Sequence, residues 1–507
     1  MTEGAVAAAA FAAVVATASV LAARARHLRP TGALPALDGW ALADRSLGAG
    51  WTWLLLGGTV FTAYTFTAVP GLVYGSGAPA FFAVPYTVVV CPLAFVLLPR
   101  LWSEARAHGH LTAADLVRGR HGSPALALAV ALTGILATMP YLALQLLGIR
   151  AVLAAGPLGP PAGPTADLVM IVLFGGLAVA TYRHGLRAPA VISALKAAAV
   201  LGAVIAVVWL VLRRFGGPGG IFTAAAHRLA ADGPSTASLT LTEGQHPAFA
   251  SLALGSALAL LMYPHVLTVA FAARGPGSLR RACIGLPAWT AVLALFGLLG
   301  IAAVAAGIRA PDGVAETAVP LLVDRLLPGP LAGLVLGAIT VGALVPAAVM
   351  SVAAATSFVR DVYVRHVHPT ATPKRQVRVA RAVSLTTKAG AVVFVYGLRD
   401  QAAVNLQLLG GVWILQIFPA VVIGLHSRRP HPRALLAGWA AGMVCGTAAV
   451  VREGFSPVVP LGPQGTVAVY AGLAALLLNL AVTALGTLLL RALPHRAPGT
   501  GTEVRTP

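Results

Sequence analysis

The sequence consists of hydrophobic runs of about 20 residues, separated by short polar joints from end to end. Of its 507 residues 58% are hydrophobic and only 10% are charged, more apolar surface than a soluble fold can bury. A bilayer core of about 30 Å needs roughly 20 apolar residues per helix. The chain is therefore predicted to be an all-α membrane protein with about 13 transmembrane helices. The expected spans are residues 4–23, 51–75, 78–99, 125–149, 166–182, 189–212, 248–273, 282–307, 328–358, 379–397, 401–425, 434–451 and 466–490.

The distribution of Lys and Arg residues predicts how the chain is oriented in the membrane. The net charge is +20, but the Lys and Arg residues lie in short joints rather than in a patch or tail, so we expect no nucleic-acid partner. With the N-terminus outside, the inner joints and the C-terminal tail, together with Arg381 at the start of its span, hold 25 of the 35 Lys and Arg residues, and the outer joints hold 8. The positive-inside rule then predicts an external N-terminus and a cytoplasmic C-terminus. The first run, 4–23, precedes its basic residues, so we expect a retained helix rather than a cleaved signal peptide.

Two spans contain unusual helix breakers at corresponding places. The second span contains Gly57, Gly58 and Pro70, and the seventh span contains Gly255 and Pro264. Inverted-repeat transporters break matching helices, because unwound backbone offers carbonyls and amides to ions and substrate. An offset of five spans predicts a five-plus-five inverted repeat. The predicted organisation is residues 1–50 for the first transmembrane helix and a cytoplasmic joint, 51–212 for the first five-helix repeat, 213–247 for an external loop, 248–425 for the second repeat, and 426–507 for two C-terminal helices and a cytoplasmic tail.

Six motifs in a fixed order carry a resemblance to a known family. They are LADRSLG (42–48), VPGLVYGSG (69–77), GLRAPAVISALK (185–196), LLMYPHVLT (260–268), GALVPAAVMSVAAATSFVRDVY (342–363) and NLQLLGGVWILQIFPA (405–420). With these motifs the chain resembles the solute:sodium symporters, and within them the bacterial monocarboxylate permease branch, over nearly its whole length. The resemblance implies a leucine-transporter-like fold in a bacterial cytoplasmic membrane. It also implies alternating access around a site near the midplane, driven by a cation gradient.

The resemblance further implies a cation site between the second and ninth spans. Its positions are Gly58 and Phe61, offering backbone carbonyls, together with Gly342, Val345 and Pro346. Sodium-binding members of the family place hydroxyl side chains where this chain has Val345 and Pro346. A hard cation needs oxygen ligands, which these two side chains lack.

Other oxygens lie near this expected site, on Thr59, Thr62 and Thr340. The sequence therefore leaves two coupling ions open, sodium and the proton. No cofactor is expected beyond this ion.

Three ionisable residues lie in or beside the spans. Charged groups there are costly and are functional candidates. Lys388 is deep in its span without an acidic neighbour in sequence, so it is a candidate contact for an anionic substrate. His265 follows the helix breaker Pro264 and is a candidate proton carrier. Lys196 is nearer the start of its span, so we expect it to reach the cytoplasmic interface and to have a structural role.

The expected substrate pocket also contains polar and aromatic residues. They lie on spans that, by the resemblance, line the cavity of a leucine-transporter-like fold. With Lys388 and His265, the candidate substrate-binding residues are Tyr64, Thr65, Tyr141, Gln145 and Tyr263. Asn405 and Gln407 begin the eleventh span and are expected to cap it or to face an outer vestibule.

The predicted function is a secondary symporter that imports short monocarboxylates of the lactate, pyruvate or propionate type, and possibly alanine, with a cation. Its expected partners are a small organic anion, the coupling cation and the lipid bilayer. The alternative is a sodium-coupled permease for another substrate such as proline or pantothenate. A channel or a membrane-embedded enzyme is less favoured, because neither a selectivity filter nor a catalytic motif is recognisable.

Overall fold

The computed structural model is almost entirely helical. It describes residues 3–25, 36–155, 164–231, 237–311, 314–397, 403–461 and 467–492. In this part of the chain ten helices are long and apolar enough to cross a membrane, and two bent helix pairs also qualify. The helix α8, Pro164–His184, covers the remaining expected span. The thirteen predicted spans therefore each correspond to a helix or a bent pair, although residues 493–507 of the expected cytoplasmic tail lie outside the described residues.

The helices of the spans have the following bounds. They are α1 (Glu3–Arg24), α3 (Ala49–Val60) with a π-helical segment (Tyr64–Ala68) and α4 (Val69–Ser76), α5 (Ala83–Ala107), α7 (Pro124–Ala155), α8, α9 (Arg187–Phe215), α11 (His246–Leu260) with α12 (Pro264–Ala272), α13 (Pro276–Ile284) with α14 (Leu286–Ala305), α16 (Gly329–Ser357), α17 (Pro373–Gly397), α18 (Ala403–Ile414) with α19 (Gly424–His426), α20 (Pro432–Arg452) and α21 (Ala471–Ala492).

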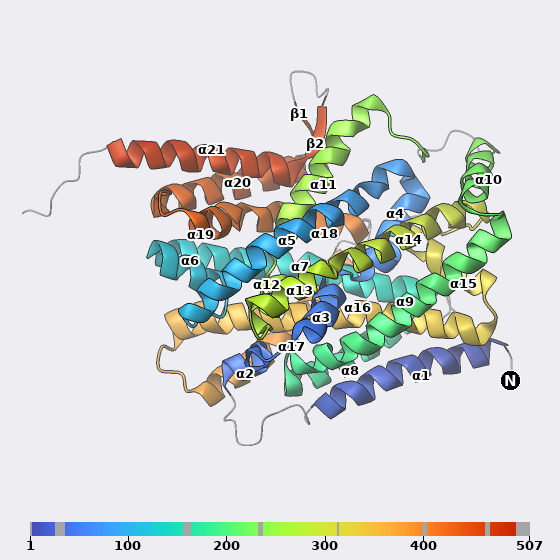
Figure 1. Cartoon of the computed structure of the whole chain (residues 1–507), viewed down its shortest axis with the longest axis horizontal. Helices are drawn as coiled ribbons and strands as arrows, with labels where there is room; N and C mark the ends of the chain where they lie inside the picture. The colour runs from blue at the N-terminus through green and yellow to red at the C-terminus, as the bar shows by residue number, and fades with distance from the viewer. Residues whose placement is uncertain are drawn as a thin grey trace, which may run out of the picture.

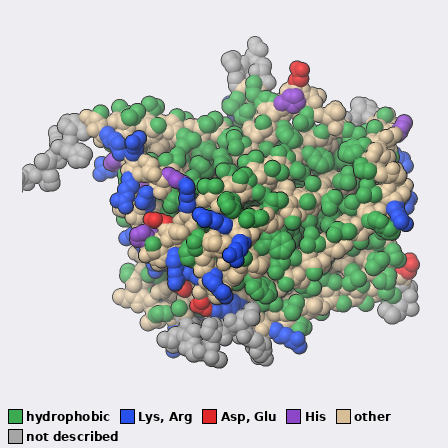
Figure 2. Space-filling model, viewed as in Figure 1, with side chains coloured by type: hydrophobic (Ala, Val, Ile, Leu, Met, Phe, Trp, Pro, Cys, Tyr) green, Lys and Arg blue, Asp and Glu red, His purple; other side chains and the backbone are tan. Residues whose placement is uncertain are grey.

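These helices lie side by side along one direction of the molecule, and α1 begins at the end opposite to the one where α21 finishes (Figure 1). Green hydrophobic side chains cover the middle of the visible face, whereas many Lys and Arg side chains gather at the left of the view (Figure 2). An apolar belt between polar ends is the surface of a protein embedded in lipid. We call the left end the arginine-rich end. Its arginines with hydrogen bonds to other elements include Arg45, Arg100, Arg120, Arg360 and Arg365.

Short elements connect the spans. They are α2 (Leu37–Ala41), α6 (Ala113–His121), α10 (Pro218–Ala231), α15 (Ala318–Leu326) and an antiparallel hairpin of β1 (Val458–Leu461) and β2 (Val467–Tyr470). One sequence expectation is corrected here. The final span begins at Ala471 rather than at residue 466, because residues 467–470 pair with β1. The segment 213–247, predicted to be an external loop, contains α10.

Helix α16 is the centre of the bundle. Nearly all of its residues from Ala332 onward are buried, and Gly and Ala are frequent among them. Small side chains allow neighbouring backbones to approach closely. At Gly333 a Cβ atom would lie only 2.1 Å from the carbonyl oxygen of Ala7 on α1. This close packing fixes α16 as the scaffold against which the broken helices lie.

Candidate functional site

Two helices are interrupted inside the bundle, so that each consists of two halves joined by a short break. The segment Ala49–Val60 is bent by 53° from Tyr64–Ser76, and Glu243–Leu260 is bent by 48° from Pro264–Ala272. At the first break Phe61 is extended, with φ −94° and ψ 103°. At the second, Tyr263 is extended and Pro264 begins α12. Each break leaves backbone groups without helical partners, as the sequence predicted from its Gly and Pro residues.

Gln145 supports the first break. Its Oε1 accepts a hydrogen bond of 3.0 Å from the backbone amide of Ala63, and its Nε2 donates to the carbonyl of Tyr141 at 3.1 Å. The side chain is fully buried on α7. Because both ends of the amide are engaged by backbone, Gln145 positions the unwound segment instead of offering free groups to a substrate.

An aromatic cluster lies where α7 meets the second break. The rings of Tyr141, Tyr263 and His265 contact one another, with centroid separations of 5.2 to 5.4 Å. All three side chains are fully buried. Tyr64, at the first break, makes an edge contact with Tyr86 at 6.2 Å. The structure thus brings together three of the residues predicted to bind substrate.

Several buried polar atoms around the breaks have no protein partner. Among the described residues these include both ring nitrogens of His265, the hydroxyl of Tyr64 and Oε1 of Gln407. A buried polar group without a hydrogen bond is costly, so such a group in a native structure calls for a ligand or water. The unpaired groups give the region between the breaks the chemistry of a polar binding pocket.

Gln407 and Thr65 are buried next to this region. The carbonyl of Gln407 accepts from the Tyr263 hydroxyl at 3.3 Å, and its side chain is only 1% exposed. The expectation that Gln407 caps its helix or faces an outer vestibule is therefore wrong, because α18 packs against the second break. Thr65 is buried in the π-helical segment beside Tyr64. Asn405, nearer the start of α18, is only partly buried.

The three carbonyls predicted to hold a cation do converge, but on an amine. Nζ of Lys196, on α9, donates to the carbonyl oxygens of Gly58 and Phe61 at 2.6 Å each and of Gly342 at 2.8 Å. The ammonium also lies 5.2 Å from the centre of the Phe66 ring. Lys196 is fully buried, so the expectation that it extends to an interface is wrong. We call Lys196 and these three carbonyls the ammonium cage.

Hydroxyl groups near the cage point elsewhere. Thr59 donates to the carbonyl of Leu55, and Thr340 donates to that of Leu336. The hydroxyl of Thr62 accepts from the amide of Tyr64. Of these threonines, which the sequence offered as extra ligands for sodium, Thr59 and Thr340 bond to their own helices, and Thr62 lies in the break and accepts from the start of the next segment.

Lys388 is held at a separate place. Its Nζ donates to the hydroxyls of Ser351 at 2.6 Å and Ser384 at 3.0 Å, and the side chain is 3% exposed. Ser351 lies nine residues beyond Gly342 on α16, about 13 Å along the helix axis. Lys388 is therefore held on a different stretch of α16 from the carbonyl of Gly342.

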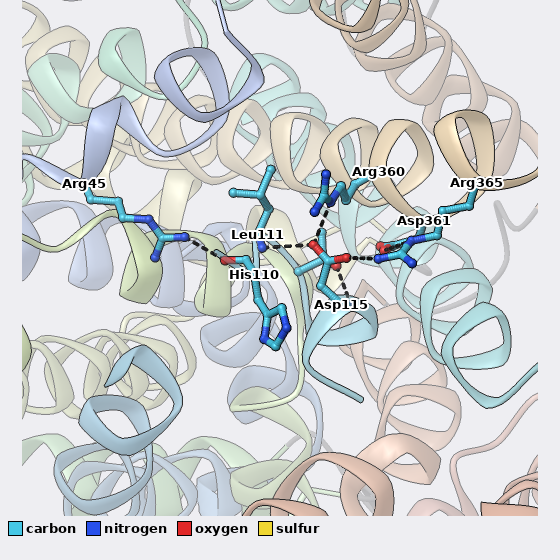
Figure 3. A network of polar contacts seen from close by, with 8 residues as sticks. Arg45, His110, Leu111, Asp115, Arg360, Asp361 and Arg365 are labelled. Atoms are coloured by element: carbon cyan, nitrogen blue, oxygen red, sulfur yellow. Dashed lines mark hydrogen bonds and ion pairs between the residues drawn. The ribbon is translucent and has the colours of Figure 1, made fainter. Parts of the chain in front are cut away.

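The arginine-rich end contains an ionic network that sequence analysis did not identify. The buried carboxylate of Asp115, on α6, accepts from Arg360 at 2.9 Å and also from Arg365 (Figure 3). It further accepts from the amide of Leu111 at 3.1 Å. Beside it, Arg45 donates to the carbonyl of His110 at 2.7 Å. The network ties the joint before α3, the joint before α7 and the end of α16 together.

The LADRSLG motif forms a tight turn at this end. Ala43, Asp44 and Arg45 have φ values of 49°, 56° and 52°, a left-handed conformation that non-glycine residues rarely adopt. Asp44 forms an ion pair with Arg187 at the start of α9. Consecutive left-handed residues persist only where neighbouring contacts fix them. The turn therefore anchors the entry to α3 against α9.

A carboxylate lies on the opposite side of the breaks from this network. Glu316, in the joint before α15, accepts at 2.8 Å from the amide of Ala403, the first residue of α18. Its backbone also packs against Gly71 of α4. Burial raises the pKa of Glu316, and the hydrogen bond from Ala403 opposes this shift. Glu316 thus connects α4, the second half of the broken helix, to α18 through a titratable group.

Comparison with known proteins places these features in a family. The profile of the "Sodium:solute symporter family" matches residues 40–442. The "Monocarboxylate transport permease protein" of Rhizobium johnstonii is 44% identical over 464 residues, which cover 91% of this chain and 92% of that protein. The "Uncharacterized symporter YodF" of Bacillus subtilis is 30% identical over 410 residues, with 80% of each chain covered.

Solved structures share the fold. The substrate-bound, outward-open form of a Na⁺-coupled sialic acid symporter superposes with a TM-score of 0.74 at 17% identity, covering 96% of this chain and 98% of the other. MhsT in complex with L-phenylalanine gives a TM-score of 0.52 at 15% identity, covering 87% and 97%. With the family profile, these matches establish a transporter and not an enzyme. The chain belongs to the sodium:solute symporter family and has a leucine-transporter-like fold with two five-helix repeats.

Proposed function

We propose that this transporter imports short monocarboxylates, of the lactate, pyruvate or propionate type and including alanine, together with a cation. The substrate binds between the two helix breaks. Alternating access then exposes this pocket first to one side of the membrane and then to the other.

One observation carries the proposal. At each helix break, the second half of the helix begins next to a polar side chain that has no protein partner. The π-helical segment begins at Tyr64 and α12 begins at Pro264, both inside the bundle. The N-terminus of a helix attracts anions through its dipole, even where its amides are already bonded within the protein, as those of Ala63 and Tyr64 are. His265 and the Tyr64 hydroxyl lie at these same positions without protein partners. A single carboxylate is the group that suits them.

The charge of the surrounding helices supports an anionic substrate. No Asp or Glu occurs in α3, α7, α9, α11, α12, α16 or α18. A substrate carboxylate entering this region meets no like charge. The 44% identical relative carries monocarboxylate transport in its name, which favours a short monocarboxylate.

In this proposal the other predicted residues have distinct roles. Tyr141, Tyr263 and Thr65 line the pocket, and Gln145 holds the unwound backbone. Lys388 serves as a second anion contact, along α16 between the pocket and the arginine-rich end. The positive-inside rule assigns that end to the cytoplasm, with the N-terminus outside. The Asp115 network then closes the cytoplasmic side of the pathway.

Transport into proteoliposomes tests the function. Labelled lactate should accumulate against its gradient, and excess unlabelled pyruvate or propionate should inhibit it. Counterflow, in which internal unlabelled lactate drives entry of labelled lactate, should occur without any ion gradient. Inhibition by proline or pantothenate, with no effect of monocarboxylates, would overturn the substrate assignment.

A further inference from the structure

The ammonium of Lys196 satisfies its cage completely. A lysine ammonium has three N–H donors, and three carbonyl oxygens accept them at 2.6 to 2.8 Å. The face of Phe66 adds a fourth favourable contact for a cation. The arrangement gives a fully buried lysine the coordination that a small metal cation would otherwise take.

The cage lies where a helix favours positive charge. Gly58 and Phe61 supply carbonyls at the C-terminal end of α3, where the helix dipole is negative. Gly342 supplies the third from α16. Sodium at this point would have to share the same oxygens with the ammonium of Lys196. Two cations in one set of ligands repel strongly in a low-dielectric interior.

We propose that the Lys196 ammonium is the resident cation of this site, and that the proton it carries takes the place of sodium as the coupling ion. The inference rests on the proposed symport function for its transport assay. It assigns to Lys196 the proton-carrying role that the sequence had offered to His265.

The coupling step is a proton transfer. Lys196 takes a proton from external water, and the ammonium ties α3, α9 and α16 together through three hydrogen bonds. When the pathway opens to the cytoplasm, one N–H bond breaks, the electron pair stays on Nζ, and the proton passes to water. The neutral amine has only two N–H donors, so one carbonyl loses its partner. The broken helix is then free to move relative to α16.

Within the part of the chain that the structure describes, no carboxylate forms an ion pair with the ammonium of Lys196. Of the helices packed against α9, α3, α14 and α16 carry no titratable side chain. The π-helical segment that contributes Phe66 brings Tyr64. The other elements packed against α9 are α1, α8 and α10. Their charged and titratable residues, like those of α9 other than Lys196, lie toward helix ends or in the connecting helix α10. These residues are Glu3 and Arg24 on α1, Asp167, Tyr182, Arg183 and His184 on α8, His227 and Arg228 on α10, and Arg187, Arg213 and Arg214 on α9.

Sodium binding to the purified protein tests the cage without any substrate. The ring of Trp289 stacks on Phe61 with centroids 5.7 Å apart, so tryptophan fluorescence reports on the cage. In wild-type protein, fluorescence and melting temperature should be the same in sodium chloride and choline chloride. Lys196→Ala leaves the carbonyls without a cation, so sodium should now raise its melting temperature and change its fluorescence. The matched variant Lys388→Ala, another buried lysine, should gain no sodium response.

A specific sodium response of the wild-type protein would overturn the inference, and this measurement does not depend on the variant folding. A folded Lys196→Ala protein without a sodium response and with unchanged proton-driven uptake would overturn it as well.

Transport provides the second arm. Wild-type uptake of lactate should follow an imposed inward proton gradient and should ignore a sodium gradient. Lys196→Ala should lose proton-driven accumulation while keeping counterflow, because exchange moves no net proton. Absence of counterflow in the wild-type protein would contradict the proposed substrate but would leave the sodium-binding result intact. Uptake by the wild type that requires sodium would overturn the coupling role of Lys196.

Discussion

The membrane interior and the arginine-rich end hold positive charge in different ways. Inside the bundle, Lys196 and Lys388 donate to backbone carbonyls and hydroxyls, which are neutral. At the arginine-rich end, Arg360 and Arg365 are paired with the carboxylate of Asp115. Neutral oxygens orient a charged amine without fixing its charge, whereas a carboxylate stabilises the charged form of its partner. The comparison indicates that the interior suits a group whose charge can change, whereas the ion pairs at the arginine-rich end suit a permanent contact between the joints.

The largest effect on stability is expected from breaking the ion pairs of Asp115 at the arginine-rich end. Asp115→Asn keeps the shape of the side chain but removes the carboxylate that Arg360 and Arg365 share, while Arg365 keeps Asp361 at 4.0 Å. Both arginines are partly exposed, so the cost is that of a hydrogen bond to a charged group, about 1.5 to 3 kcal/mol for each arginine, and the melting temperature of the purified protein should fall. Glu104→Gln is the control, because Glu104 pairs with the exposed His108 and should change the melting temperature little. Equal melting of the Asp115→Asn variant and wild type would remove the distinction between the two regions.

The next largest effect separates the two interior lysines. If Lys388 contacts the substrate anion, Lys388→Met removes a charge-assisted hydrogen bond worth roughly 1.5 to 3 kcal/mol, about 10- to 150-fold in apparent affinity. Uptake should weaken by this factor while its dependence on external pH stays as in wild type. The measurement is the concentration dependence of lactate uptake at two pH values. An unchanged apparent affinity would make Lys388 a structural residue.

A smaller effect is expected at the aromatic cluster. His265→Phe keeps a ring between Tyr141 and Tyr263 but removes both nitrogens that lack protein partners. Loss of one hydrogen bond to a carboxylate corresponds to roughly a 10-fold weaker apparent affinity. Counterflow should show this change, and proton-driven accumulation at saturating lactate should persist. If uptake by this variant lost all its dependence on pH, the residue that carries the coupled proton would be His265 and not Lys196.

The smallest effect concerns Glu316. Its pKa is raised in the folded protein, so the folded state binds more protons than the unfolded state between the ordinary value of 4.5 and the raised value. Stability should therefore decrease as pH rises through this window. Glu316→Gln keeps the acceptor for the amide of Ala403 and should flatten the dependence of melting temperature on pH. A slope identical to that of wild type would show that other groups cause it.

Much of the fold follows from local sequence. Spans are predictable because each needs roughly 20 apolar residues, whatever its neighbours. The breaks near Gly58 and Pro264 were also visible, because helix-breaking residues act locally. The short β-hairpin was not, because Val467–Tyr470 is as apolar as the helix that follows it. Hydropathy alone does not distinguish a buried strand from the first turn of a span.

The candidate site was only partly predictable. The carbonyls of Gly58, Phe61 and Gly342 were expected to converge, and they do. Their occupant was missed because Lys196 is on a different helix, and only tertiary packing brings its amine to the break. Asp115 was missed for a related reason. A carboxylate in the first turn of a short polar helix is typical of a helix N-terminus, and its two arginines are more than 240 residues away.

The ammonium cage also bears on how ion use changes during evolution. Its oxygens belong to the main chain, so substitutions at the three positions leave the ligands in place as long as the helices keep their course. Selection can then act on few codons: that of Lys196, which decides whether an amine fills the site, and those of Val345 and Pro346, where hydroxyl side chains would add ligands for a metal ion. A lineage that moves from a sodium-rich habitat to fresh water or soil has a short mutational route to a different energy source, without rebuilding the transporter around it.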